Sequence, residues 1–111
     1  MNAWQHGDEV IFMAPQSRRH HGKPVIDAVA ACAKKLGITR MTQRMDSEGT
    51  GANGRTHSAH FFELADQPVE LAFVLEKALA ERLIEAVDEA GIDVFVLRRD
   101  VAYAQLGGER R

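Results

Sequence analysis

Short apolar runs along the chain predict β-strands. Residues 10–14 (VIFMA) form a continuous apolar run that ends at Pro15, which predicts a strand buried on both faces. Residues 69–75 and 94–97 also place apolar side chains on both sides of an extended chain. We therefore expect a sheet with three strands that are apolar on both faces.

Two weaker strands flank a glycine-rich segment. Residues 38–46 alternate methionines with polar side chains, which predicts a strand with one polar face. Residues 56–64 alternate in the same way after the loop of residues 47–55, which contains three glycines. A hairpin extension is therefore expected after the second strand.

Two stretches place apolar residues at helical spacing. Residues 25–36 follow Pro24, which suits the first turn of a helix because its missing N–H is not needed there. The second stripe covers residues 79–87. Gly37 and Gly91 stand just beyond the two stripes, where a helix commonly ends.

The order of these elements predicts an α+β fold of the ferredoxin-like βαββαβ type. Right-handed crossovers would place both helices on one face of the sheet. The other face would then expose more apolar surface than a soluble monomer usually does, so we expect a homo-oligomer. Residues 1–8 show no periodicity and predict a flexible N-terminal arm, residues 9–106 form the domain, and residues 107–111 are a polar tail.

Composition narrows the class of protein. The 111 residues carry a net charge of −2, which gives no cationic field for non-specific nucleic-acid binding. The one cysteine, Cys32, cannot form an internal disulfide, lies on the first helical stripe and is expected to be buried. There is no signal-peptide pattern and no apolar run near membrane-spanning length, so the sequence predicts a cytoplasmic protein.

The glycine segment matches G-x-G-x-x-G at residues 49–54, but a strand is expected after it where a dinucleotide site needs a helix. Two interpretations remain open. One is a type I′ turn centred on Asn53 and Gly54. The other is a mobile loop whose backbone amides and Arg55 contact a phosphate or carboxylate.

Basic residues supply further candidates for anion binding. The segment RRHHGK at residues 18–23 leads into the first helix, and its Lys23 could flank one anion together with Arg55 of a neighbouring subunit. Arg98 and Arg99 form a second candidate pair at the end of the last strand.

Histidines suggest two other functions. His20 and His21 are adjacent and could join a metal site only across chains. A metal-binding trimer resembling CutA-type proteins would use His20, His21 or His57 as ligands. Alternatively, His57 could serve as the acid or base of a small ferredoxin-fold enzyme, although the sequence offers no catalytic partner for it.

The segments GKPVIDAVAACAKKLGI and EGTGANGRTHSAHFFELADQPVELAFV resemble the uncharacterised PII-like family, small relatives of the PII nitrogen-regulatory signal proteins. The closing VFVLRRDVAYAQLGGE is similar to the final strand and tail of PII proteins. The likeness covers residues 9–106. It implies a ferredoxin-like homotrimer with three inward-packed sheets, acting in signalling rather than as an enzyme.

The resemblance also implies an effector and a target. PII relatives bind small effectors, often adenine nucleotides, in clefts between subunits, and a T-loop, here residues 46–56, docks onto a target such as a transporter. Together with the basic candidates above, the implied effector-binding residues are Gly49, Thr50, Gly51, Arg55, His57, Lys23, Arg98 and Arg99. The implied partner-binding loop comprises Asp46, Ser47, Glu48, Ala52, Asn53 and Gly54.

The chain departs from the PII pattern where phosphates would bind. Thr50 replaces an aromatic residue, and residues 89–93 shorten a glycine-rich loop and lack its lysine. Ala104 and Leu106 stand where PII tails carry two arginines. AMP or ADP, or no nucleotide, fits these changes better than ATP does.

Overall fold

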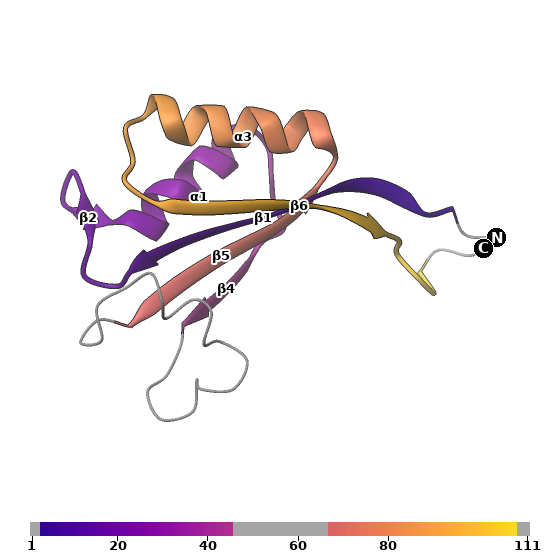
Figure 1. Ribbon diagram of the computed structural model, residues 1–111, viewed down its shortest axis with the longest axis horizontal. Coiled ribbons are helices and arrows are strands. Elements are labelled where there is room, and N and C mark those ends of the chain that lie inside the picture. The colour runs from indigo at the N-terminus through magenta and orange to yellow at the C-terminus, as the bar shows by residue number, and fades with distance from the viewer. Residues whose placement is uncertain (1–2, 46–66, 109–111) are drawn as a thin grey trace.

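The structure is a computed structural model and describes residues 3–45 and 67–108. Its elements follow the order shown in Figure 1: β1 (Gln5–Pro15), β2 (Arg19–His20), β3 (Lys23–Pro24), α1 (Val25–Lys35), β4 (Thr42–Met45), β5 (Pro68–Leu75), α3 (Lys77–Glu89) and β6 (Phe95–Tyr103). Four strands form an antiparallel sheet in the order β4-β5-β1-β6, and β2 pairs with β3. The α+β class predicted from the sequence is confirmed.

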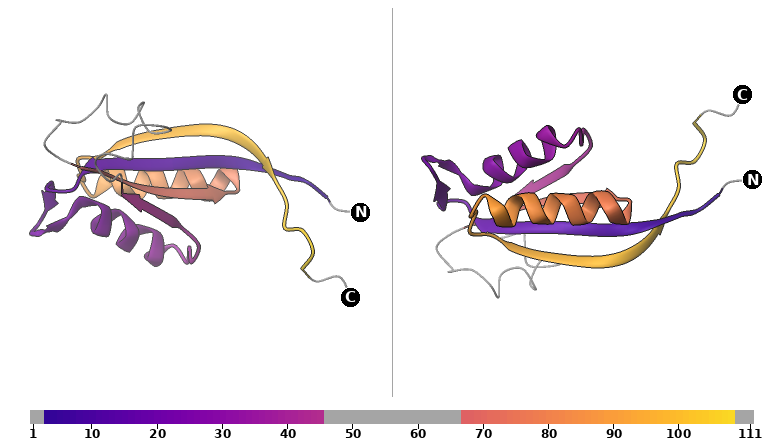
Figure 2. Two further views of the ribbon diagram at one scale, coloured as in Figure 1. Left: turned by 90° about the horizontal axis from the view of Figure 1, so that it is seen from below. Right: turned by 90° about the horizontal axis from the view of Figure 1, so that it is seen from above.

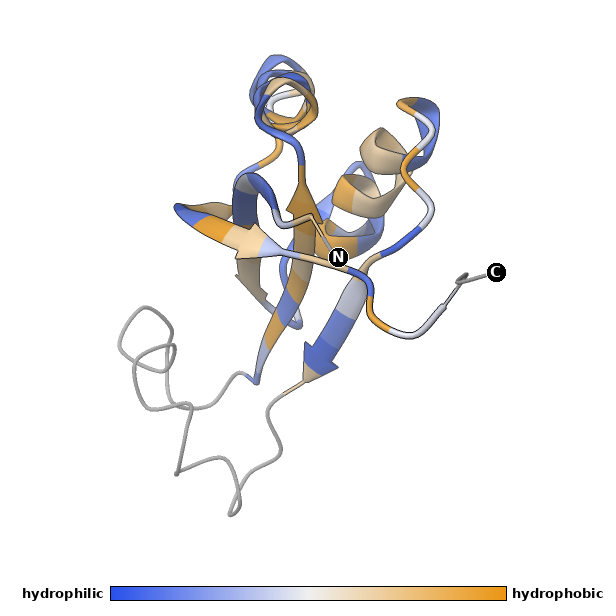
Figure 3. Cartoon of the chain, turned by 90° about the vertical axis from the view of Figure 1, so that its right-hand side faces the viewer, coloured by the Kyte–Doolittle hydropathy of each residue, from blue (hydrophilic) through white to orange (hydrophobic). Residues whose placement is uncertain are grey.

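The two helices of the described residues, α1 and α3, cover one face of the four-stranded sheet (Figure 2). The core lies between them, and Phe12 of β1 meets Phe73 of β5 edge-on with 5.9 Å between ring centroids. Val29 of α1 and Leu83 of α3 are fully buried against these strands. In Figure 3 the strands beneath the helices carry much of the apolar colour.

The helices form where the periodicity predicts them. Gly37 and Gly91 follow their last turns with φ of 82° and 72°. Pro24 is the residue before α1 rather than part of its first turn, because its ψ of 141° is extended and its backbone pairs with Arg19. Cys32 is half-buried and packs against the core.

The first and last strands are longer than the sequence predicted. The prediction of a flexible arm over residues 1–8 is wrong for residues 5–8, because these belong to β1 and pair with the end of β6. The strand expected at residues 94–97 continues to Tyr103. Although residues 94–97 are apolar on both sides, they do not form a strand buried on both faces, because β6 is an edge strand and Phe95 is 38% exposed.

The second strand is shorter than expected. Of the predicted residues 38–46, the structure describes 38–45, and within these only Thr42–Met45 forms a strand, β4. All four residues of β4 are exposed at the sheet edge. Residues 46–66, which include the expected glycine loop and the strand at 56–64, lie outside the described residues.

We call the sheet side away from the helices the far face. β1 is buried there too, with Ile11 and Met13 only 6% and 1% exposed. On β5 the far face carries Glu70 as well as Val74, which is 49% exposed. Of the three strands expected to be apolar on both faces, β1 is therefore the one that is buried on both. The homotrimer stays a prediction.

Within the described residues, no helix combines the length and hydrophobicity needed to cross a membrane.

Candidate functional site: two hollows and a buried carboxylate

A shallow groove of about 310 Å³ lies on the far face, between β4 and the C-terminal end of β6. We call it the far-face groove. Its lining residues combine charged, aromatic and aliphatic side chains: Glu9, Arg40, Met41, Thr42, Arg44, Ala72, Phe73, Val74 and Tyr103. Arg44 donates to Glu70 at 3.4 Å, whereas Arg40 forms no ion pair among the described residues. The groove therefore offers a ligand the guanidinium of Arg40 and the half-buried ring of Tyr103.

A second hollow, about 180 Å³, lies between the β2–β3 hairpin, the first turn of α1 and the ends of β4 and β5. We call it the hairpin pocket. Its apolar lining consists of Pro15, Pro24, Val25, Ile26, Met45 and Val69. Its polar lining consists of Gln16, Arg19, Asp27 and Gln43.

The β2–β3 hairpin positions the basic segment predicted from the sequence. Its two central residues, His21 and Gly22, have φ of 50° and 84°, as a type I′ turn requires. Arg18 ties the hairpin to the loop before β6, donating to the Asp93 carbonyl at 3.3 Å and lying 3.6 Å from its carboxylate. The hairpin is therefore held against the body of the domain.

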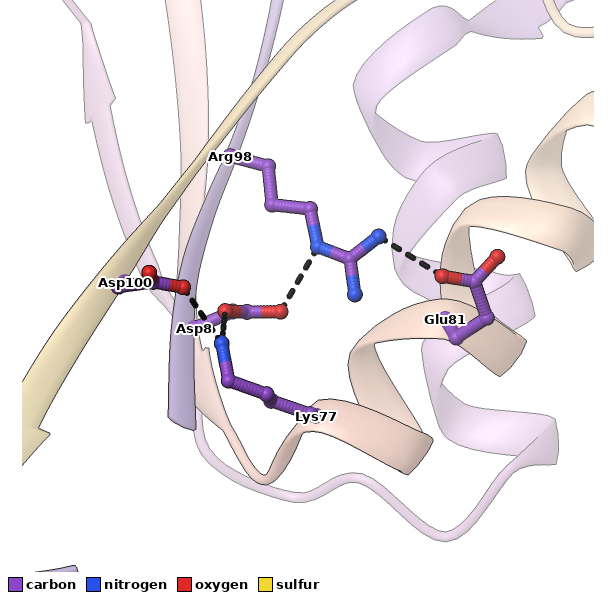
Figure 4. A network of polar contacts seen from close by, with 5 residues as sticks. All are labelled: Asp8, Lys77, Glu81, Arg98 and Asp100. Atoms are coloured by element: carbon purple, nitrogen blue, oxygen red, sulfur yellow. Dashed lines mark hydrogen bonds and ion pairs between the residues drawn. The ribbon is translucent and has the colours of Figure 1, made fainter. Parts of the chain in front are cut away.

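A buried carboxylate, Asp8, joins β1, β6 and α3 (Figure 4). Its side chain is 2% exposed and accepts hydrogen bonds from Lys77 Nζ at 2.6 Å and Arg98 Nε at 2.7 Å. Lys77 also reaches Asp100 at 2.5 Å, and Arg98 reaches Glu81 at 2.8 Å. Asp8 and Asp100 are direct cross-strand partners, and the ammonium of Lys77 binds both, which reduces the repulsion between the two carboxylates.

These contacts shift the ionisation of all three central groups. The hydrogen bonds from Lys77 and then Arg98 lower the pKa of Asp8. The carboxylates of Asp100 and Asp8 raise the pKa of Lys77, and those of Glu81 and Asp8 raise the pKa of Arg98. The network is charged at neutral pH and acts as a structural clamp, since each of its cations is already held by two carboxylates.

The family described as DUF190, uncharacterized ACR, matches residues 10–103, which is most of the chain. The chain belongs to the DUF190 family. Among curated proteins no match was found.

Solved structures with the same fold are PII-like. CPII bound to ADP, AMP and acetate, from Thiomonas intermedia K12, gives a TM-score of 0.65 at 11% identity and covers 93% of each chain. The apo form of CPII, described as a nitrogen regulatory PII-like protein, gives 0.62 at 8% identity, covering 95% of this chain and 99% of CPII. A protein from Thermus thermophilus with a provisional PII-like signaling assignment gives 0.58 at 15% identity, covering 90% and 91%. The DUF190 chain therefore has a PII-like fold.

The structure separates the basic residues that the sequence predicted as effector ligands. Lys23 is exposed in the hairpin, beyond the Pro15 end of β1, and forms no ion pair among the described residues. Arg98 pairs in register with Val10, roughly 16 Å back along β1 at the usual rise of a strand. Lys23 and Arg98 therefore do not meet within one chain.

The two predicted arginines of β6 already have partners. Arg98 is held by Asp8 and Glu81, and Arg99 donates to Glu9 at 2.6 Å. Glu81 of α3 is half-exposed and is bound to Arg98. The other predicted effector and partner residues, Gly49, Thr50, Gly51, Arg55, His57 and the rest of residues 46–56, lie outside the described residues.

Two of the predicted metal ligands, His20 and His21, contact each other through their rings. The rings of His20 and His21 stack with 4.2 Å between centroids. In the part of the chain that the structure describes, no three His, Cys, Asp or Glu residues are grouped for a metal ion.

Sequence reasoning missed Arg40, Tyr103 and Asp8. Tyr103 is the chain's one tyrosine, yet nothing in the pattern places it near Arg40. Asp8 stands next to the apolar run of β1, where an acidic residue at strand spacing from Val10 and Phe12 was a signal for a buried, paired carboxylate.

Proposed function

We propose that this DUF190 protein is a trimeric PII-like regulator rather than an enzyme. It binds a small effector, an adenine nucleotide, between subunits and transmits occupancy through residues 46–56 to a target protein such as a transporter. The observation that carries the proposal is the family match over residues 10–103 together with the PII-like fold of the described residues.

The surface of the sheet supports the assembly. Val74 and Phe95 expose apolar side chains on the far face, and a second copy would bury them. The far-face groove lies on the same surface, so a neighbouring subunit packed on this face would deepen a shallow groove into a cleft.

The chemistry of the far-face groove supports a nucleotide. A nucleobase can lie against an aromatic ring such as that of Tyr103, and the guanidinium of Arg40 suits one phosphate group. CPII of Thiomonas intermedia K12 is described as bound to ADP and AMP. AMP or ADP is our preferred effector because other cations of this face are already engaged: Arg44 is bound to Glu70 and Arg99 to Glu9.

The point where residues 46–66 join the sheet supports the coupling. Met45 and Val69 are cross-strand partners at the end of β4 and the start of β5. The strands that flank the segment are therefore paired with each other. The far-face groove reaches this end of the sheet through Arg44, the residue before Met45, so an effector in the groove acts on the segment along β4. It can shift the segment only if it binds one of its conformations more tightly than the other.

Titration calorimetry of the full chain with AMP, ADP, ATP, cyclic AMP and bicarbonate tests the effector. We expect heat from AMP or ADP and about tenfold weaker binding in Arg40→Gln, because a charge-assisted hydrogen bond to phosphate is lost. Arg82→Gln, which removes an exposed arginine of α3, is the matched control. If none of the five compounds gives heat, the proposed effector binding is wrong. If the chain sediments as a monomer at micromolar concentration, the proposed trimer is wrong.

Trypsin offers a separate test of coupling, because Arg55 provides a cleavage site within residues 46–56. We expect saturating AMP or ADP to change the rate of cleavage after Arg55 several-fold, measured by mass spectrometry. Cleavage after Arg82 within α3 is the internal control. If the nucleotide binds but the rate after Arg55 stays the same, the coupling is wrong and the binding site stands.

A further inference from the structure

The hairpin pocket has no role in the proposed function, and its size limits what it can hold. Its volume of about 180 Å³ corresponds to the liquid volume of about six waters and falls below the range of about 300–1,000 Å³ for larger ligands. The pocket therefore suits a ligand smaller than a nucleotide. The pocket shares no lining residue with the far-face groove, so the two hollows are separate.

The lining combines an apolar wall with a cation. Two prolines, Val25, Ile26 and Val69 suit a short hydrocarbon body. Arg19 stands at the pocket, and the structure gives it no ion pair within residues 3–45 and 67–108, whereas the neighbouring Arg18 is bound to Asp93. A guanidinium prefers a planar carboxylate, which it can bind through two parallel hydrogen bonds.

The remaining polar residues restrict the ligand further. Gln16 and Gln43 bring neutral amides to the lining, and Asp27 brings a carboxylate. The carboxylate of Asp27 repels any anion and repels a dianion more strongly, so a dianion is disfavoured relative to a monoanion of similar size. The position of Arg19 is set by the hairpin, whose turn fixes β2 against β3.

We propose that the hairpin pocket binds a small organic monocarboxylate, with Arg19 holding its carboxylate and the apolar wall packing on a short aliphatic body. The site is independent of the nucleotide site proposed above. A ligand of about six heavy atoms has few contacts to offset the cost of association, so the expected Kd is on the order of a millimolar.

Titration of the ¹⁵N-labelled full chain with sodium butyrate, against sodium chloride at equal ionic strength, tests the proposal. We expect amide shifts in residues 16–27 and 43–45, with about tenfold weaker binding in Arg19→Gln because its charged hydrogen bonds are lost. Arg19→Lys, which keeps the charge without the planar fork, should fall between the two. Arg82→Gln is the matched control and should bind as the parent does.

Three results would overturn the site. The first is that the amides of these residues do not shift. The second is that Arg19→Gln binds butyrate like the parent, and the third is that Arg82→Gln loses as much affinity as Arg19→Gln. Succinate or inorganic phosphate binding as tightly as butyrate would overturn the assignment to a monocarboxylate. Because calorimetry with AMP reports on Arg40 and this titration on Arg19, either proposal can fail without the other.

Discussion

Gly7→Ala is expected to lower the free energy of unfolding by roughly 3 kcal/mol, because a side chain at this position has no room. A Cβ on Gly7 would lie 2.2 Å from the carbonyl oxygen of Leu75 and 3.0 Å from the ring of Tyr103. Leu75 is the last residue of β5, and its backbone crosses Gly7 as the chain turns towards α3. The ring of Tyr103 can rotate, but the Leu75 carbonyl can move only if the end of β5 moves.

Chemical denaturation, monitored by circular dichroism, measures the loss of unfolding free energy. Gly108→Ala is the matched control, since its new Cβ would meet only Gln105 at an ordinary 3.8 Å. Equal midpoints for the two variants would show that the turn after β5 can relax, and would contradict the close approach at Gly7.

Asp8→Asn is expected to destabilise the fold strongly at neutral pH. The amide preserves the shape of the side chain but removes the charge that Lys77 and Arg98 share, and Asp8 is 2% exposed, so water cannot replace it. Asp100→Asn removes the other carboxylate on Lys77 at an 88% exposed position, where the effect should be small. A similar loss in both variants would contradict the argument that burial makes Asp8 important.

The pH dependence provides an independent check. The pKa of Asp8 is lower in the folded chain than in the unfolded chain, so its contribution is complete above the unfolded pKa of about 3.9. It is lost as the pH falls through the lower folded pKa. The stability difference between the parent and Asp8→Asn should therefore be constant near neutral pH and shrink below about pH 4. Urea unfolding at a series of pH values measures it.

The helices could be predicted because their signals are local. The apolar stripes and the glycines at positions 37 and 91 lie within a few residues of the turns that they specify. The ends of β1 and β6 could not be predicted in the same way. Residues 5–8 become a strand because they pair with residues 100–103 and because Asp8 meets cations from α3 and β6. Such contacts join distant parts of the chain and leave no periodic pattern.

For the candidate sites too, the sequence predicted local features but not contacts between distant residues. The sequence identified the basic segment that leads into α1, and the hairpin presents its Lys23 to solvent. It also proposed Arg98 and Arg99 as effector ligands, although the structure engages both with carboxylates. A list of cations does not show which are already neutralised. Arg40 and Arg19 became candidates only when their lack of an ion pair among the described residues could be combined with a hollow beside each.

The pairing of β1 has a consequence for how the protein is made. Met13 pairs with Phe95 and Gln5 with Tyr103, so β1 finds its β6 partner only after residues 95–103 have been translated. Until then, the edge of β1 that β6 will cover stays open and favours association with other chains. Contacts between such distant residues also slow the search for the native state. We therefore expect folding to be completed late in synthesis, once β6 is available to pair with β1.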